Sequence, residues 1–236
     1  MNNSRRPATE PRLRSSTPLY FRYTIRLLRH FPNFDFPFIL SLRRKAVECL
    51  QLPSGGRALD MGCGTGGSFP YLVGAVGQTG EVVGVEISPE VANTARKRIA
   101  ANHWVNAHVV VADARSVVLS GKFDGVLMFG APDIYASQDA LLNLLPYLND
   151  GARLVAFGMK LTNRRFGRFL NLLSTSLMRL SFASTPGLSF EPWSPLQAYS
   201  TEITVNEYVC GCFFLASCSI RSRCIGENHG TEGRSV

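Results

Sequence analysis

Short apolar runs alternate with helical patterns along the middle of this chain. Five of the runs are almost continuously apolar, which is typical of strands that are buried on both faces of a parallel sheet. These runs span residues 57–61, 82–86, 107–111, 123–129 and 153–157. Strands that alternate with helices are the signature of βαβ units. The pattern therefore predicts an α/β fold.

Two of the intervening helices have clear start signals. Ser88, Pro89 and Glu90 supply an N-cap, a proline in the first helical turn and an acid near the positive end of the helix dipole. A second helix is predicted to begin near Ser137 and to end before Pro146. Both helices follow predicted strands, as the βαβ pattern requires.

The pattern changes after the fifth strand. Residues 161–181 are predicted to form an amphipathic basic helix, and residues 186–195 a proline-rich connection. Residues 202–208 and 212–218 indicate two final strands, which are close enough in sequence to pair as an antiparallel hairpin.

The composition, with 45% hydrophobic and 18% charged residues among 236, is that of a globular protein, and this length is common for one α/β domain. Residues 1–16 lack apolar periodicity and are predicted to be a disordered arm. We expect residues 17–50 to form a helical lid, residues 51–218 the main domain and residues 219–236 a disordered tail.

The net charge of +8 is unevenly distributed. Residues 1–50 hold ten Lys and Arg against three acids, and residues 160–190 hold five against none, whereas residues 51–159 hold seven against nine. The positive charge therefore belongs to the predicted arm, the predicted lid and one late helix, and it does not indicate a nucleic-acid partner. Amphipathic patterns in residues 19–31 and 163–180 instead suggest peripheral docking on an anionic membrane, or a solvated lid.

The six cysteines include no C-x-x-C pair. Strand alternation places Cys210 and Cys212 on one face, and buried apolar cysteines are expected rather than a metal site. The N-terminus lacks the pattern of a secretory signal, and the apolar runs are too short to span a bilayer. These features predict a cytoplasmic protein that could lie at the inner membrane surface.

The first strand runs into a glycine-rich turn, Gly62, Gly64 and Gly66, which allows backbone N–H groups to approach a ligand closely. Together with Gly67 the turn also satisfies the G-x-G-x-x-G pattern of dinucleotide sites. Asp60 separates the two possibilities. Its carboxylate would repel a pyrophosphate but would attract the sulfonium and ammonium groups of S-adenosylmethionine.

Two further acids, Glu86 and Asp113, stand at the ends of the second and third strands. Glu86 is placed to accept hydrogen bonds from ribose hydroxyls, and Asp113 from the exocyclic amine of adenine. Because the carboxyl ends of parallel strands meet at one edge of a sheet, Asp60 should lie near both. Three acids at this edge suit a cationic nucleoside.

The segments LDMGCGTG, VVGVEISPE and VVVADA resemble the cofactor-binding motifs of class I S-adenosylmethionine-dependent methyltransferases. The resemblance extends from about residue 43 to residue 218. It implies a Rossmann-like, mostly parallel sheet of seven strands with an antiparallel last strand and helices on both faces. It also implies S-adenosyl-L-methionine as cofactor.

Carried over by position, the resemblance implies a set of cofactor-binding residues. The methionine part would lie against the turn, at Asp60, Gly62, Cys63 and Gly64, and Gly66 belongs to the same turn. The ribose would contact Glu86, and the adenine would lie between Ile87 and the pair Asp113 and Ala114. Phe129 and Gly130 would border the methyl group. Alternatively, the glycine-rich turn only connects a strand to a helix and binds no ligand. The three acids argue against this interpretation.

The sequence contains no compelling general base, and methyl transfer to a nucleophilic acceptor does not require one. Asp133 and Tyr135 follow the fourth strand, where acceptor pockets of the family lie, and His30 is in the predicted lid. These three are the catalytic candidates. Residues 130–133 depart from the family motif that grips a nucleobase amine, which argues against a nucleic-acid base as acceptor.

The resemblance is greatest to bacterial members that act on small molecules, quinones or lipids. We therefore predict methyl transfer from S-adenosylmethionine to a small, apolar acceptor. Two alternatives stay open: transfer of the cofactor's 3-amino-3-carboxypropyl group to a lipid, and a non-catalytic binding protein with the same fold.

Overall fold

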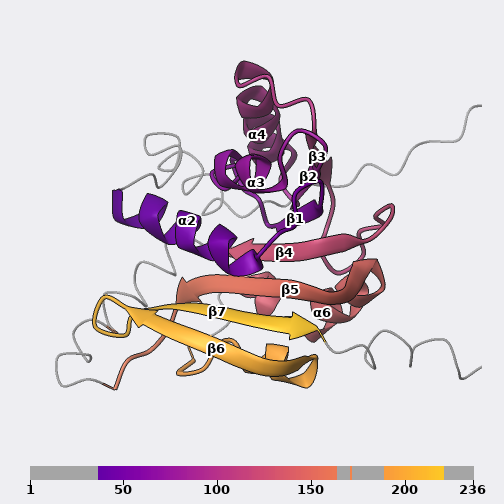
Figure 1. The fold of residues 1–236 in the computed structure, drawn as a ribbon. Helices are drawn as coiled ribbons and strands as arrows, with labels where there is room; N and C mark the ends of the chain where they lie inside the picture. Colours follow the sequence, from indigo (N-terminus) through magenta and orange to yellow (C-terminus); the bar gives the residue numbers. More distant parts are fainter. Residues whose placement is uncertain (1–36, 164–170, 172–188, 221–236) are drawn as a thin grey trace, which may run out of the picture.

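Seven strands form a single sheet. They are β1 Arg57–Met61, β2 Glu81–Glu86, β3 Ala107–Val111, β4 Phe123–Phe129, β5 Leu148–Met159, β6 Ser200–Tyr208 and β7 Phe213–Ile220. The computed structural model describes residues 37–163, 171 and 189–220. The strand order is β3-β2-β1-β4-β5-β7-β6 (Figure 1). All pairs are parallel except the two made by β7, so the predicted mostly parallel sheet with an antiparallel last strand is confirmed.

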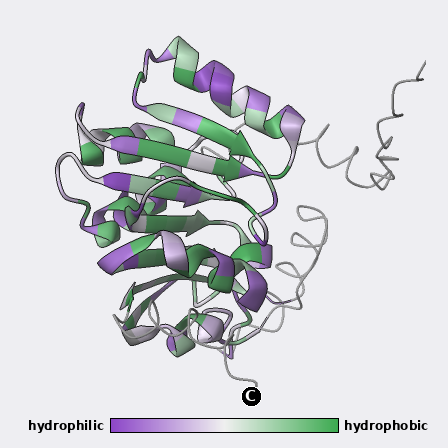
Figure 2. Ribbon diagram, turned by 90° about the vertical axis from the view of Figure 1, so that its right-hand side faces the viewer, coloured by the Kyte–Doolittle hydropathy of each residue, from purple (hydrophilic) through white to green (hydrophobic). Residues whose placement is uncertain are grey.

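Helices cover both faces of this sheet, as predicted. One face carries α2 Pro37–Leu50, α3 Phe69–Val76 and α4 Pro89–Ala101. The other carries α5 Pro132–Tyr135, α6 Gln138–Leu144 and the 3-10 helices η1 Leu145–Tyr147 and η2 Ser194–Ala198. The strands between these layers are mostly hydrophobic (Figure 2), and two buried clusters fill the two interfaces.

The predicted start signals are confirmed. The Ser88 hydroxyl accepts a hydrogen bond from Val91 N at 3.4 Å, and the Ser137 hydroxyl accepts one from Ala140 N at 3.3 Å. The first four strands lie within one residue of their predicted bounds, whereas β5 is longer than predicted at both ends. It starts at Leu148, which pairs with Phe123 of β4, and residues 149–152 form an irregularity before regular pairing resumes at Arg153.

Helix α2 lies within the predicted lid but packs as a core helix. Leu42, Ala46, Val47 and Leu50 are buried against the sheet. Figure 1 shows α2 lying across the face formed by β4 and β5. Residues 37–50 are thus helical, as predicted, and one face of α2 is part of the core; the lid stays a prediction, and residues 17–36 lie outside the described part of the chain.

The predicted antiparallel hairpin of the last two strands is confirmed, but its turn differs from the prediction. Residues 209–212 form the turn, with φ of 48° at Val209 and 55° at Cys210. Cys210 is exposed and Cys212 is buried, so these cysteines do not share a strand face as predicted. Strand β7 continues to Ile220, two residues into the predicted tail. Cys224, the arm and most of the predicted helix at 161–181 lie outside the described residues.

Candidate functional site

The candidate site lies where the strand order reverses. β1 pairs with β2 on one side and with β4 on the other, all three parallel. The connections that leave β1 and β4 therefore diverge at their carboxyl ends, and open α/β sheets bind ligands in the crevice at such a point. The glycine-rich turn after β1 and residues 129–130 at the end of β4 flank this crevice.

The glycine-rich turn has the backbone conformation that the sequence predicts. Gly62, Gly64 and Gly66 have φ of 76°, 57° and 79°, a region that favours glycine. The amides of Gly62 and Cys63 both donate to Val85 O, which fixes the turn against β2. A Cβ atom added to Gly64 would meet no described atom within 4 Å, so a ligand has room to approach the backbone there.

Asp60 is the most perturbed acid of the site. It is 1% exposed, and its Oδ2 has no hydrogen-bond partner among the described residues. Burial raises the pKa of Asp60 to about 7, the positive charge of Arg43 lowers it, and Glu86 raises it further. A buried carboxylate oxygen without a partner is costly, so this site fits a cationic ligand that supplies a donor.

Glu86 joins the glycine-rich turn to the start of α4. Its Oε2 accepts from Gly64 N at 3.1 Å and its Oε1 from Ser88 N at 2.9 Å. Burial raises the pKa of Glu86, whereas these backbone hydrogen bonds lower it. Each carboxylate oxygen can accept a second hydrogen bond, so Glu86 is held in place with capacity for ligand hydroxyls.

Residues after β2 and β3 form the other end of the site. Ile87 is 59% exposed, which leaves an apolar side chain available to a flat ring. Ala114 is buried. The Asp113 carboxylate pairs with Arg115, Oδ2 lying 2.5 Å from Nη2, and this hydrogen bonding lowers the pKa of Asp113. Asp113 is thus an ionised acceptor at the predicted adenine end.

Phe129 and Gly130 end β4 at the middle of the crevice. The Phe129 ring stacks on Phe157 with a centroid distance of 4.2 Å. Gly130 has φ of 72° and no described atom within 4 Å of an added Cβ. This open, partly aromatic position suits the reacting end of a ligand.

The structure separates the catalytic candidates. Asp133 is exposed at the start of α5, and its charge raises the pKa of Glu86. Tyr135 is 1% exposed and packs edge-on against Phe214, which gives it a packing role. Burial raises the pKa of its hydroxyl, so Tyr135 is a neutral phenol at physiological pH. His30 lies outside the described residues.

Arg43 belongs to the site, although the sequence reasoning did not identify it. It projects from α2, and its Nη1 donates to the Ser68 hydroxyl at 2.9 Å beside the glycine-rich turn. Its position in the sequence carried a signal. Leu42, Ala46 and Val47 are buried on one face of α2, and Arg43 stands on that apolar face at helical spacing.

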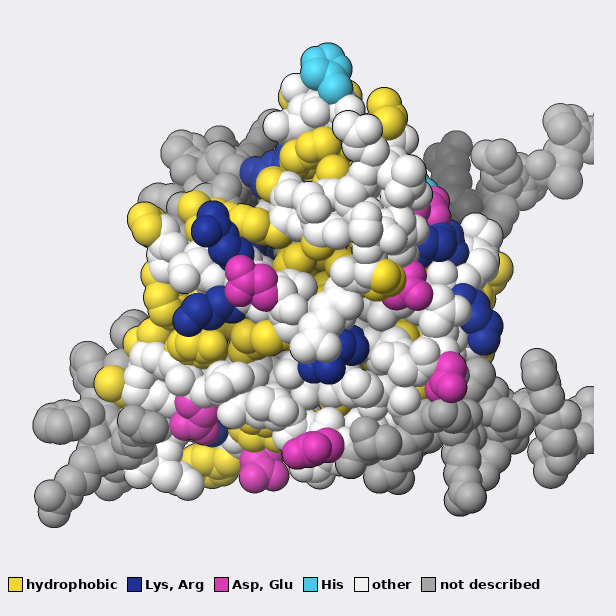
Figure 3. Space-filling model, viewed as in Figure 1, with side chains coloured by type: hydrophobic (Ala, Val, Ile, Leu, Met, Phe, Trp, Pro, Cys, Tyr) yellow, Lys and Arg dark blue, Asp and Glu magenta, His cyan; other side chains and the backbone are white. Residues whose placement is uncertain are grey.

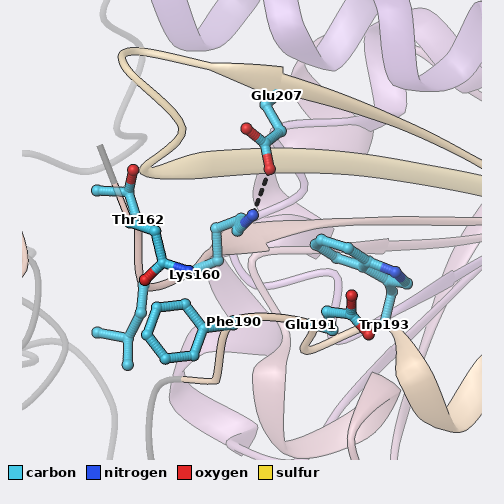
Figure 4. Close-up of a pocket in the computed structure, with 8 residues that line it drawn as sticks. Lys160, Thr162, Phe190, Glu191, Trp193 and Glu207 are labelled. Carbon is cyan, nitrogen blue, oxygen red and sulfur yellow. Dashed lines mark hydrogen bonds and ion pairs between the residues drawn. The ribbon is translucent and has the colours of Figure 1, made fainter. Parts of the chain in front are cut away.

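A pocket of about 420 Å³ lies beyond the carboxyl end of β5 (Figure 4). Its lining comprises Lys160, Leu161, Thr162, Asn163, Phe190, Glu191, Trp193 and Glu207. The Lys160 ammonium, 8% exposed as a residue, pairs with Glu207 and lies 5.1 Å from the centroid of the Trp193 ring. The pocket thus combines aromatic rings with one ion pair, in which Lys160 is buried and Glu207 is exposed.

Comparisons with known proteins agree with this geometry. Residues 58–150 match the methyltransferase domain family. The chain is 31% identical over 113 residues to the 2-phytyl-1,4-naphtoquinone methyltransferase of Thermosynechococcus vestitus, covering 47% of this chain and 49% of that protein. It is 30% identical over 142 residues to the ubiquinone/menaquinone biosynthesis C-methyltransferase UbiE of Pseudomonas savastanoi, covering 58% and 56%. The chain therefore aligns with about half the length of these relatives.

Solved structures match the fold at lower identity. An S-adenosylmethionine-dependent methyltransferase from Aquifex aeolicus aligns with a TM-score of 0.55 at 20% identity, covering 75% of this chain and 89% of that one. An S-adenosylmethionine-dependent O-methyltransferase from Thermotoga maritima aligns with a TM-score of 0.57 at 16% identity, covering 80% and 67%. At such identities these likenesses establish the fold.

Proposed function

Because this chain contains a methyltransferase domain with the class I fold, we propose that it transfers the methyl group of S-adenosylmethionine to a small, apolar acceptor. One observation carries the proposal: the buried Asp60 carboxylate, whose Oδ2 has no hydrogen-bond partner among the described residues, lies beside a glycine-rich turn that leaves room for a ligand. Names of relatives that refer to quinones support an aromatic, quinone-like acceptor.

The chain's own residues supply binding and alignment in this proposal. Asp60 binds the ammonium group, Glu86 accepts from the ribose hydroxyls, and the exposed side chain of Ile87 covers one face of the adenine. When bound, S-adenosylmethionine supplies an activated methyl group on a positively charged sulfur. Phe129 and Gly130 border that methyl group and exclude water, which suits an in-line displacement.

Thiol chemistry is not part of this mechanism. Burial and the charges of Asp60 and Glu86 raise the pKa of the Cys63 thiol. Cys63 is therefore a protonated, buried side chain rather than a nucleophile. Its role is to pack beneath the turn, since a Cβ on Gly84 would lie 2.7 Å from its Sγ atom.

The acceptor enters, in this proposal, from the pocket beyond β5. β5 runs parallel to β4, and its Phe157 lies opposite Phe129, the last residue of β4. Lys160 follows Phe157 by three residues, so it lies beyond the level at which β4 ends. In Figure 4, Phe190 and Trp193 lie on either side of the Lys160 side chain. Aromatic walls suit a flat ring, and the Lys160–Glu207 pair offers a donor and an acceptor to its oxygen substituents.

Product analysis tests the proposed reaction. The purified protein is incubated with methyl-labelled S-adenosylmethionine and a bacterial lipid and quinone extract, and the products are identified by mass spectrometry. We expect S-adenosylhomocysteine and one labelled, extractable product. Methylthioadenosine as by-product would instead indicate 3-amino-3-carboxypropyl transfer. Cofactor binding without any product would favour the non-catalytic alternative.

A further inference from the structure

Two exposed hydrophobic side chains lie beside the tip of the β6–β7 hairpin. Val209 in the turn is 47% exposed, and Phe38 at the start of α2 is 41% exposed. Phe38 packs edge-on against Phe213, the first residue of β7, with ring centroids 5.9 Å apart. Figure 1 shows the start of α2 and this turn on the same side of the molecule. The start of α2 and the hairpin tip are thus neighbours.

A third exposed ring, Phe190, is tied to the same turn. The residue before it, Ser189, accepts a hydrogen bond from Leu161 N at 3.0 Å, and Lys160 N donates to Cys212 O at the end of the turn at 2.9 Å. The Phe190 side chain is 46% exposed. Three exposed apolar side chains therefore share one corner of the molecule, here called the hairpin corner: Phe38, Phe190 and Val209.

The backbone of the turn is unfavourable for the residue it contains. Val209 has φ of 48° and Cys210 has φ of 55°. This left-handed region is disfavoured for a β-branched side chain, and tight hairpin turns with positive φ favour Asn and Gly. The turn thus retains a strained and exposed apolar residue where a polar one would fold more easily. Such strain points to a use of the Val209 side chain outside the fold.

Two basic segments join the described part of the chain at the hairpin corner. Residues 1–36 precede α2 and hold seven Arg against two acids. Residues 164–188 leave after Asn163, return at Ser189 and hold four Arg and no acid. An anionic partner would therefore be attracted to this corner.

The described side chains at the corner do not reverse this charge. Glu207 pairs with Lys160, which leaves Glu191 as the second acid of the adjoining pocket. Lys45 of α2 lies beside the turn, with its ammonium nitrogen 5.4 Å from the centroid of the Tyr208 ring. Exposed apolar groups surrounded by a basic excess are typical of surfaces that dock on anionic membranes.

We propose that the hairpin corner inserts its three apolar side chains into the surface of an anionic lipid bilayer. The inference goes beyond the proposed reaction, because docking requires neither cofactor nor acceptor. It assigns the strained Val209 a function as a membrane anchor. Phe190 also lines the pocket beyond β5, so docking would place that pocket at the lipid surface.

Co-sedimentation of the full chain with vesicles, without cofactor or acceptor, tests the proposal. At low salt we expect the wild-type protein to bind equimolar phosphatidylglycerol and phosphatidylcholine at least ~10-fold more tightly than phosphatidylcholine alone. Val209→Asn should bind the anionic vesicles at least ~3-fold more weakly, because an inserted apolar side chain is lost. Val105→Asn is the matched control, since it makes the same replacement at a 97% exposed position before β3, and it should leave binding unchanged.

The Val209→Asn protein should be at least as stable to heat as the wild type, because Asn tolerates left-handed backbone. If it does not fold, Val209→Gly replaces it, with the same expected loss of binding. Unchanged binding by a folded Val209 variant, or an equal loss in Val105→Asn, would overturn the proposal. Wild-type protein that binds no anionic vesicle would overturn it in favour of a protein partner at this corner. Neither failure would affect the proposed function, which cofactor binding tests separately.

Discussion

Under the proposed function, Asp60 favours ligand binding but costs folding stability. In an unfolded chain an Asp carboxyl has a pKa near 3.8, whereas burial raises the pKa of folded Asp60 to about 7. Between these values the folded protein holds a proton that the unfolded chain has released, so stability falls as the pH rises. Under the proposed function, the same carboxylate binds the cationic cofactor, which would offset this cost.

Replacement of Asp60 by Asn should therefore stabilise the ligand-free protein, and more so at high pH. The gain in the free energy of unfolding at pH 8 should exceed the gain at pH 5 by about 3 kcal/mol, because two pH units of the penalty lie between them. Urea unfolding at both pH values measures this difference. The exposed Asp139→Asn variant is the control, and an effect of Asp60→Asn that is equal at the two pH values would contradict the explanation.

Phe190 tests the proposed acceptor pocket at the residue scale. Its side chain lines the pocket and is 46% exposed, so truncation should cost little stability. Phe190→Ala should raise the KM for the acceptor by roughly 10-fold through the loss of ring contact, about 1.4 kcal/mol. Steady-state kinetics measure this KM, and the affinity for the cofactor should stay unchanged. Val118→Ala, at an 84% exposed position, serves as control, and an unchanged acceptor KM in Phe190→Ala would remove this residue from the acceptor site.

The sequence allowed Asp60 and Glu86 to be predicted because each ends a strand beside a recognisable turn. Arg43 could not be assigned in the same way. Its contact with Ser68 and Phe129 depends on how α2 crosses the sheet, which is a tertiary arrangement. The packing role of Tyr135 was hidden for the same reason, since it follows from its contact with Phe214 on another strand.

At the scale of elements, α2 joins the core to the candidate site. Its apolar face packs on β4 and β5, and Arg43 on that face lies against the glycine-rich turn. A loss of α2 packing would therefore weaken both the fold and the site.

Leu42→Ala tests whether α2 is part of the core. Leu42 is 2% exposed, and truncation of a buried Leu typically costs about 2–5 kcal/mol. Chemical denaturation should record a loss in this range, whereas Ser41→Ala at an exposed position of the same helix should change stability little. A detachable lid would give almost no loss for Leu42→Ala, and that result would contradict the packing described above.

Elements with strong local signals were predicted almost to the residue. The N-cap residues Ser88 and Ser137 start their helices as expected. The first residues of β5 were missed because Asn149, Asp150 and Gly151 have the composition of a turn. Leu148 and Arg153 both pair with β4, so this polar stretch is an irregularity within the strand, which local sequence patterns do not report.

At the scale of the whole molecule, most of the positive charge lies in segments outside the candidate site. On the face crossed by α2, Lys and Arg side chains are interspersed with acids and hydrophobic groups (Figure 3). The structure therefore does not gather the described basic residues of this face into a stripe. No helix among the described residues is long and apolar enough to cross a membrane.

We propose that the basic excess of residues 1–50 and 160–190 serves peripheral docking on anionic membranes. Vesicle flotation should show binding to anionic vesicles at low salt, release at high salt and little binding to neutral vesicles. Combined replacement of Arg22, Arg26 and Arg29 by Gln should reduce the bound fraction. Failure of the wild-type protein to bind anionic vesicles at low salt would exclude this role.

Calorimetric titration of S-adenosylmethionine into the wild-type protein and Asp60→Ala tests the central claim most directly. We predict one saturable site in the wild-type protein and at least ~10-fold weaker binding in Asp60→Ala, about 1.4 kcal/mol or more, because a charge-assisted hydrogen bond is lost. Glu86→Ala should weaken binding similarly, and the exposed Asp139→Ala should not. Absent wild-type binding, or unchanged affinity in a folded Asp60→Ala protein, would contradict the account.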